Sequence, residues 1–311
     1  MVKVPTKPML KLLIIILCLL LSPGWSFAAG QAEVSVLFSA DIAPYRQAFE
    51  GFREIVQQKR GGIAIIEHIL EREKPEKVAR QIDSQKPLLV FTVGPEAAKF
   101  AGTNLHHTPL IFSMVLRPQS LAAPNVTWVS LEIPARARLE MIRKLLPGVR
   151  RIGVIFSPDS APLYQEIARE CDRLGLRPVG RQIESGTELP EAFAGIAPKI
   201  DLFLMVPDTR VFSPKSIQYL LAEAMKTRVP VVGLAASYSR AGALLSFEAD
   251  YRDIGRQAGA MALRIIDGEN PTSIKPATPR GIKTSLNLAV AKRLRISLDA
   301  AAVKEAAEVF K

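Results

Sequence analysis

Short apolar runs alternate with helical segments along most of this chain, and the alternation constrains the fold more than any other feature. Leu88–Val93 is an apolar run with one polar residue, and Gly94-Pro95 then opens a helical segment. Ile152–Phe156 and Leu202–Val206 are similar runs that helical spacing also follows. Continuous apolar strands joined by helices are typical of parallel sheets covered on both faces. The sequence therefore predicts an α/β fold.

The alternation of strands and helices occurs in two successive units. They have similar make-up and cover about 33–130 and 131–246, and a C-terminal segment follows them. No Gly/Ser-rich linker divides the units, so we expect this segment to pack back on both. Ligands of open α/β sheets bind at the carboxyl ends of the strands, and two facing sheets would form a cleft there.

The first 28 residues have the pattern of a secretory signal peptide. Three lysines precede ten apolar residues, Leu12–Leu21, and the small residues Ser26 and Ala28 follow. A membrane-spanning helix needs roughly 20 apolar residues, so this run is too short. We expect cleavage near Ala28, loss of Cys18 with the signal, and export of the remaining chain.

Charge and cysteine content exclude two classes of protein. The formal net charge is +11, and the loss of three signal lysines would leave +8. The basic residues are spread along the chain without a basic tail, so we expect a solvated basic surface and no nucleic-acid partner. Cys171 would be the remaining cysteine, which excludes an internal disulfide and indicates a buried, inert thiol.

The sequence holds none of the common catalytic or metal-binding motifs. His68, His106 and His107 lack metal-ligand spacing, and no phosphate-binding loop, dinucleotide fingerprint or nucleophile elbow occurs. We expect no metal, no cofactor and no enzymatic reaction.

Blocks of sequence resemble a known family, in the order and spacing that the family shows. They include "LLVFTVGPEAA", "TPLIFSMVLRP", "LPGVRRIGVIFSP" and "DLFLMVPDTRVFS". The chain resembles the periplasmic substrate-binding proteins of ABC importers, in the branch that includes tryptophan- and tyrosine-type binders. The resemblance implies a type I periplasmic-binding fold with two Rossmann-like lobes joined by a three-segment hinge. It places 29–130 plus about 248–275 in one lobe, and 131–247 plus about 276–311 in the other.

The resemblance also implies a function. A monomer would capture a small polar molecule, such as an amino acid, by hinge closure and deliver it to an ABC permease and its ATPase. A ligand-sensing subunit for a membrane receptor or kinase is an alternative, because it needs the same closed state. A periplasmic enzyme is a third and weaker alternative.

The chain departs from the family's usual residues at several points. Gly94-Pro95-Glu96 stands where Gly-Thr-Pro is usual, Arg117-Pro118 where Asp-Pro is frequent, and Trp128 where glycine is common. These changes replace groups near the ends of strands, and they weaken the case for tryptophan or tyrosine as the ligand.

The turn after Leu202–Val206 carries the first candidate site. Asp208 could accept the ammonium of an amino-acid-like ligand, or it could form an Asx turn. Thr209 is a candidate donor. Arg210 and Arg117 could bind a carboxylate or phosphate in bidentate fashion, or they could be surface arginines.

The other candidates also follow predicted strands. Tyr45 could stack on a ligand or pack at the start of a helix, and Tyr238 lies in a predicted turn before the last crossover. The backbone after Gly94 could bind an anion at a helix N-terminus. The remaining candidates share these positions at strand ends: Asp41, Pro95, Glu96, Ser113, Phe156 and Ser157.

Overall fold

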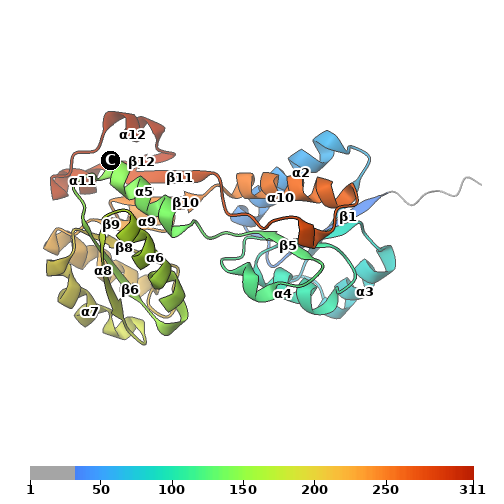
Figure 1. The fold of residues 1–311 in the computed structure, drawn as a ribbon, viewed down its shortest axis with the longest axis horizontal. Helices are drawn as coiled ribbons and strands as arrows, with labels where there is room; N and C mark the ends of the chain where they lie inside the picture. The colour runs from blue at the N-terminus through green and yellow to red at the C-terminus, as the bar shows by residue number, and fades with distance from the viewer. Residues whose placement is uncertain (1–31) are drawn as a thin grey trace, which may run out of the picture.

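A computed structural model describes residues 32–311 and shows two α/β lobes side by side (Figure 1). The predicted signal peptide and its cleavage point lie outside the described residues. The first lobe is built on a five-stranded sheet of order β2-β1-β3-β4-β5, and the second on a seven-stranded sheet of order β12-β11-β10-β9-β8-β6-β7. The α/β prediction is confirmed.

The first sheet is parallel throughout, and its strands are largely buried except for the edge strand β2. They are β1 (Glu33–Phe38), β2 (Ala64–Ile69), β3 (Leu89–Val93), β4 (Leu110–Ser113) and β5 (Val126–Val129). All five residues of β3 are buried, as expected for a central strand covered on both faces. The register aligns Phe38 with Val93 and Val93 with Ser113, so that the carboxyl ends meet at one edge.

Helices cover both faces of this sheet. On one face, α2 (Ala43–Lys59) packs against α10 (Tyr251–Ile266), which comes from far along the chain (Figure 1). Gly51 and Gly255 lie where these helices cross, and a Cβ on either would overlap a backbone carbonyl of the other helix. The other face packs against α3 (Pro75–Gln85) and α4 (Pro95–Asn104).

The second sheet contains β6 (Arg151–Phe156), β7 (Arg177–Gln182), β8 (Leu202–Leu204), β9 (Val231–Gly233), β10 (Leu245–Ala249), β11 (Ile282–Asn287) and β12 (Glu308–Phe310). Within residues 32–311, β10–β11 is the one antiparallel pair, and this departs from the predicted all-parallel sheets. The direction reverses because β11 enters from the first lobe rather than through a covering helix.

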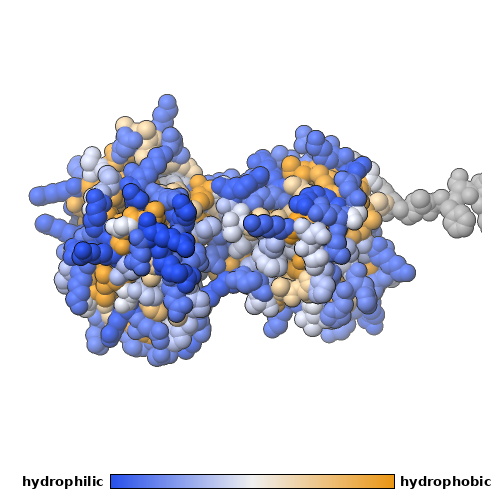
Figure 2. All heavy atoms as spheres, in the orientation of Figure 1, coloured by the Kyte–Doolittle hydropathy of each residue, from blue (hydrophilic) through white to orange (hydrophobic). Residues whose placement is uncertain are grey.

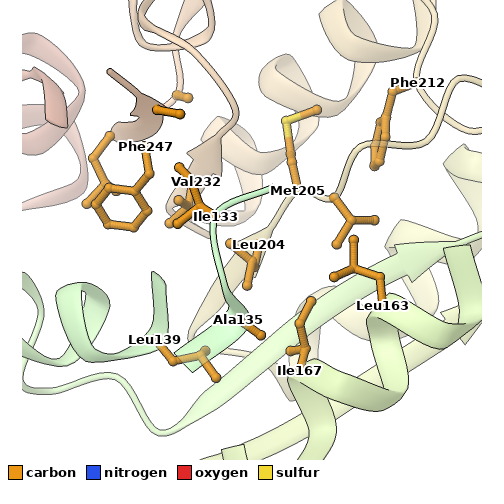
Figure 3. Close-up of a cluster of buried hydrophobic side chains, with 14 of the residues drawn as sticks. Ile133, Ala135, Leu139, Leu163, Ile167, Leu204, Met205, Phe212, Val232 and Phe247 are labelled. Carbon is orange, nitrogen blue, oxygen red and sulfur yellow. The ribbon is translucent and has the colours of Figure 1, made fainter. Parts of the chain in front are cut away.

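The helices of the second lobe surround its sheet and one continuous core. They are α5 (Ala135–Leu145), α6 (Ala161–Arg173), α7 (Leu189–Ile196), α8 (Pro214–Thr227), α9 (Ala236–Ala241), α11 (Leu288–Leu294) and α12 (Ala300–Glu305). Figure 3 shows apolar side chains of α5, α6, β8 and β10 converging. Ser213 caps α8 by accepting a hydrogen bond from the Ser216 N–H, as its sequence predicts.

One local prediction is wrong. The segment from Ala235 to Arg240, which carries Tyr238, was expected to be a turn and forms helix α9 instead. Ser239 explains the helix, because its buried hydroxyl hydrogen-bonds with the Ser246 hydroxyl of β10 and donates to the Ser285 carbonyl of β11. These partners lie in other strands, so local sequence does not reveal them.

The chain passes between the lobes three times, and the passages lie beside one another. They follow β5, β10 and the short 3₁₀ turn Pro271–Ser273. The Ser130 N–H donates to the Ala277 carbonyl at 2.9 Å, and the Asp250 N–H donates to the Gly281 carbonyl at 2.9 Å. Figure 2 shows two largely hydrophilic bodies joined by a narrower waist at these passages.

Candidate ligand-binding site

A groove runs along the border between the lobes, at the carboxyl ends of the second lobe's parallel strands. It consists of two hollows that share Leu116, Pro207 and Leu234. The hinge hollow has a volume of about 260 Å³ and includes Glu132, Ile133 and Arg138 near the first passage and Phe247, Ala249 and Tyr251 at the second. The outer hollow, of about 350 Å³, includes Arg117, Asp159, Asp208, Thr209, Arg210 and Tyr238.

Asp208 joins the loops after β6 and β8. Its Oδ2 accepts hydrogen bonds from the Ser157 N–H at 2.7 Å and from the Ser160 hydroxyl. Its Oδ1 accepts from the N–H groups of Arg210 at 3.0 Å and Val211 at 3.1 Å. Burial raises the pKa of this carboxyl, but the hydrogen bonds outweigh burial and hold the pKa below its usual value.

The Asp208 carboxylate therefore determines the shape of the turn that the sequence singled out. Two carboxylate oxygens offer about four acceptor positions, and the protein's own donors approach all of them. The alternative of an Asx turn describes the bonds from Arg210 and Val211 well. Acceptance of a ligand ammonium by Asp208 stays a prediction.

Arg117 connects the two lobes. It follows β4 in the first lobe, and its Nη1 donates to the backbone carbonyl of Asp159 in the second lobe at 3.0 Å. Arg210 forms an ion pair with the Asp159 carboxylate at 3.3 Å. Arg210 is exposed and Arg117 is half-buried, and both line the outer hollow, so each could also approach an anionic ligand. Thr209 is exposed beside them, and burial in the outer hollow raises the pKa of Tyr238.

The first lobe brings a second set of predicted residues together. Gly94 has φ +104 and precedes α4, and a Cβ there would lie 2.8 Å from the Tyr45 ring. Tyr45 is half-buried, and burial together with the Glu96 carboxylate raises its pKa. The Ser39 hydroxyl accepts from the Ala97 N–H at 2.9 Å and so caps the first turn of α4.

Asp41 lies nearby and is paired. Its carboxylate contacts Arg46 at 2.5 Å and Arg72 at 2.9 Å. The hydrogen bond from Arg46 is the main reason that the pKa of Asp41 lies below its usual value. In this structure Asp41 therefore holds two arginines of the first lobe.

Three further predicted residues are buried in the ends of strands. The Ser113 hydroxyl donates to the Thr92 carbonyl at 3.0 Å, and the ring of Phe156 stacks on Tyr164 with centroids 4.3 Å apart. Ser157 is fully buried, and its hydroxyl has no hydrogen-bond partner among the described residues. These contacts explain the local structure, and roles in ligand binding stay predictions.

The structure thus separates the predicted residues into groups. Arg117, Asp208, Thr209, Arg210 and Tyr238 line the outer hollow. The other predicted residues, all in the described part of the chain, line neither hollow: Asp41, Tyr45, Gly94, Pro95, Glu96, Ser113, Phe156 and Ser157.

The sequence reasoning missed two charged residues of the hinge hollow. Arg138 is 4% exposed, although arginine is rarely buried without a partner. Burial and the nearby Glu166 carboxylate raise the pKa of Glu132. The sequence could have revealed the burial of Arg138, because helical spacing places it on the same face of α5 as the buried apolar residues Ala135, Leu139 and Ile142.

No group of three or more His, Cys, Asp or Glu side chains within 32–311 could hold a metal ion. None of the helices in that range is both long and apolar enough to cross a membrane.

Comparisons with known proteins agree with this architecture. A family model described as ABC transporter substrate binding protein matches residues 69–310. A tyrosine-binding protein of Clostridioides difficile is 23% identical over 214 residues, which are 65% of this chain and 61% of that protein. The chain therefore matches less than two thirds of that relative's length.

Two solved structures are similar over nearly the whole described chain. One is the ligand-free, open form of a substrate-binding protein with adhesive properties from Clostridium difficile, with TM-score 0.77 and 19% identity. The other is an ABC domain from Streptococcus pneumonia in complex with L-Trp, with TM-score 0.63 and 20% identity. Each match covers 90% of this chain, and they cover 99% and 100% of those chains respectively.

These matches confirm the predicted type I periplasmic-binding fold and the expectation of a binding protein rather than an enzyme. The family match spans most of the chain, from the end of β2 to β12, and includes the whole second sheet and the residues that line the groove. The chain belongs to the ABC transporter substrate-binding protein family.

Proposed function

We propose that this protein captures an amino acid or a similar small solute in the groove between its lobes and delivers it to an ABC importer. The observation that carries the proposal is the position of the groove at the carboxyl ends of parallel strands, where α/β proteins bind ligands. Residues from both lobes and from two of the passages line it. A ligand bound there would contact both lobes at once.

Hinge closure follows from this placement. The two lobes would move as units, 29–130 plus about 248–275 and 131–247 plus about 276–311, about the three adjacent passages. A ligand that gains contacts on closure shifts the equilibrium toward the closed state by that difference in affinity. Closure would also bring Tyr45, Gly94 and Glu96 toward the outer hollow. The closed face would then dock on a membrane permease driven by an ATPase.

Two relatives support an amino acid as the ligand class. One is named a tyrosine-binding protein, and another was solved in complex with L-Trp. The departures at Gly94-Pro95-Glu96, Arg117 and Trp128 argue against a simple transfer of either ligand. Export of the protein as a monomer after removal of residues 1–28 is part of the same proposal.

Native mass spectrometry of the purified protein, followed by calorimetry with the twenty amino acids, tests the proposal. We expect at least one amino acid to bind with micromolar affinity, about −8 kcal/mol, and to shorten the distance between the lobes in X-ray scattering. Absence of binding across the panel would refute the amino-acid class. Binding without a change in scattering would refute hinge closure alone.

A further inference from the structure

Arg138 is a buried charge at the innermost end of the groove. It lies in the first turns of α5, directly after the first passage between the lobes, and lines the hinge hollow. Its side chain is 4% exposed. Burial is the main reason that the pKa of its guanidinium lies below the usual value, although nearby Glu132 and Glu166 oppose this shift.

One edge of the Arg138 guanidinium has no partner. Nη1 approaches the Met205 carbonyl at 3.5 Å, whereas Nε and Nη2 have no hydrogen-bond partner among residues 32–311. Nε–H and Nη2–H point the same way from the planar group and together form its side-on bidentate edge. Buried donors without partners are costly, so this edge is a place where an acceptor would bind strongly.

In two other arginines of this chain, the edge formed by Nε and Nη2 binds a carboxylate. Arg151 directs Nε and Nη2 at Oδ1 of Asp201, with distances of 3.1 and 2.6 Å. Arg280 directs the same two nitrogens at the carboxylate of Asp253, at 3.3 and 2.8 Å. Carboxylates are therefore the partners that this edge takes elsewhere in the molecule.

No carboxylate of the protein takes this position. Within the described residues, Arg138 forms no ion pair, and the Glu166 carboxylate instead accepts a hydrogen bond from the Ala135 N–H at 3.3 Å. Glu132 lines the same hollow as Arg138. A ligand that carries both a carboxylate and a cationic amino group would complement this pair of opposite charges.

We propose that the Nε/Nη2 edge of Arg138 binds the carboxylate of an amino-acid ligand in the hinge hollow. The inference rests on the proposed function and deepens it by naming the group that anchors the ligand. Apolar residues, among them Leu131, Phe247 and Ala249, line much of the rest of the hollow, and apolar walls strengthen a charge pair by lowering the local dielectric constant. The bound carboxylate would thereby supply the partner that the buried guanidinium lacks in the free protein.

The test compares Arg138→Met with wild type and with Arg151→Met, a matched control in which a paired surface arginine is removed. The probes are L-tyrosine, L-tryptophan and L-leucine, each beside its amine without a carboxylate: tyramine, tryptamine and isopentylamine. We expect wild type to bind the best acid about 100-fold more tightly than its amine, a size typical of a buried charge pair. Arg138→Met should lose this preference, and Arg151→Met should keep it.

Stability separates a ligand anchor from a structural arginine. Removing an unpaired buried charge should leave the urea midpoint of ligand-free Arg138→Met equal to or above that of wild type. A lower midpoint together with unchanged affinity would overturn the inference and indicate an internal ion pair.

The inference can be overturned with wild-type protein alone, by comparing its affinities for each amino acid and the corresponding amine, even if Arg138→Met does not fold. Equal affinity of wild type for an acid and its amine would overturn the role of Arg138 and leave the proposed function standing. If none of the three amino acids binds to wild type and the full panel also fails, the proposed function falls and this inference falls with it. If another amino acid binds, its own amine replaces the probe.

Discussion

Oδ2 of Asp208 accepts the backbone N–H of Ser157 at 2.7 Å, and this bond ties the end of β8 to the end of the neighbouring strand β6. The same carboxylate holds its own turn through the N–H groups of Arg210 and Val211. One side chain therefore shapes two loops of the groove before any ligand arrives. Such preorganisation lowers the entropy lost on binding.

Asp208→Ala should lower ligand affinity at least about tenfold while the protein keeps its fold. The substitution leaves several donors of the two loops without their acceptor, at a cost of about 1–3 kcal/mol. Calorimetry measures the affinity, and circular dichroism checks the fold. Asp299→Ala is the control, because Asp299 is exposed and its side chain makes no capping bond to α12 in the described structure. Equal affinities of wild type and Asp208→Ala would contradict the prediction.

The stabilisation from Asp208 should depend on pH. The pKa of its carboxyl in the folded protein lies below the usual value for aspartate, so the unfolded chain binds more protons near that usual value. The contribution is therefore complete above the unfolded pKa and is lost as pH falls through the folded pKa. Urea unfolding of wild type and Asp208→Asn should show a stability difference at pH 6 that shrinks below about pH 4. A constant difference would exclude this linkage.

Arg117→Ala should shift the free protein toward more open forms. The side chain donates across the groove to the Asp159 carbonyl at 3.0 Å, and this bond is exposed to solvent, so we expect a change of about 1 kcal/mol or less. Fluorescence energy transfer between labels on the two lobes measures the shift. Arg177→Ala, at an exposed position of β7, is the matched control. An unchanged transfer efficiency in Arg117→Ala would show that the bond does not influence lobe separation.

Gly255→Ala should destabilise the first lobe by about 2–3 kcal/mol, because a new Cβ would overlap the Ala48 carbonyl where α10 crosses α2. Gly195→Ala should have the opposite effect on stability. Nothing in the described structure lies within 4 Å of a Cβ at Gly195 in α7, so alanine should stabilise by about 0.5–1 kcal/mol. Denaturant unfolding measures both. Equal effects of the two substitutions would contradict the close helix crossing.

The thiol of Cys171 should react with alkylating reagents when the second lobe unfolds and not before. Its side chain is fully buried in α6, and burial raises the pKa of the thiol to about 12. The thiolate is the reactive species, so native protein at pH 8 should be protected. Peptide mass spectrometry after timed labelling, with and without urea, measures this. Rapid labelling of Cys171 in native protein would contradict the structure.

Strand-helix alternation predicted most of the architecture because it reports burial directly. Leu88–Val93 and Ile152–Phe156 are buried strands of two separate sheets, as their apolar runs indicate. Helix ends are also encoded locally, since Ser213 caps the start of α8 and Gly175, with φ +70, follows the end of α6. These features depend on residues near one another in sequence.

The candidate site was predicted in part. The turn after Leu202–Val206 does lie on the groove, and Arg117 joins it from the other lobe. The internal bonds of Asp208 could not be foreseen, because Ser157 and Ser160 lie about fifty positions away in the chain. The antiparallel β11 and the helix α9 were missed for a similar reason.

The sequence by itself determined the fold class, the family and the turn after Leu202–Val206 that lies on the groove, because strand periodicity and sequence motifs encode them. Only the tertiary structure decided which polar groups already have partners. The Asp208 carboxylate already accepts hydrogen bonds from the protein on both oxygens. Arg138 lies on the buried face of a helix, and its Nε and Nη2 have no hydrogen-bond partner among the described residues. Both properties depend on distances between residues far apart in the chain, which a linear pattern does not contain.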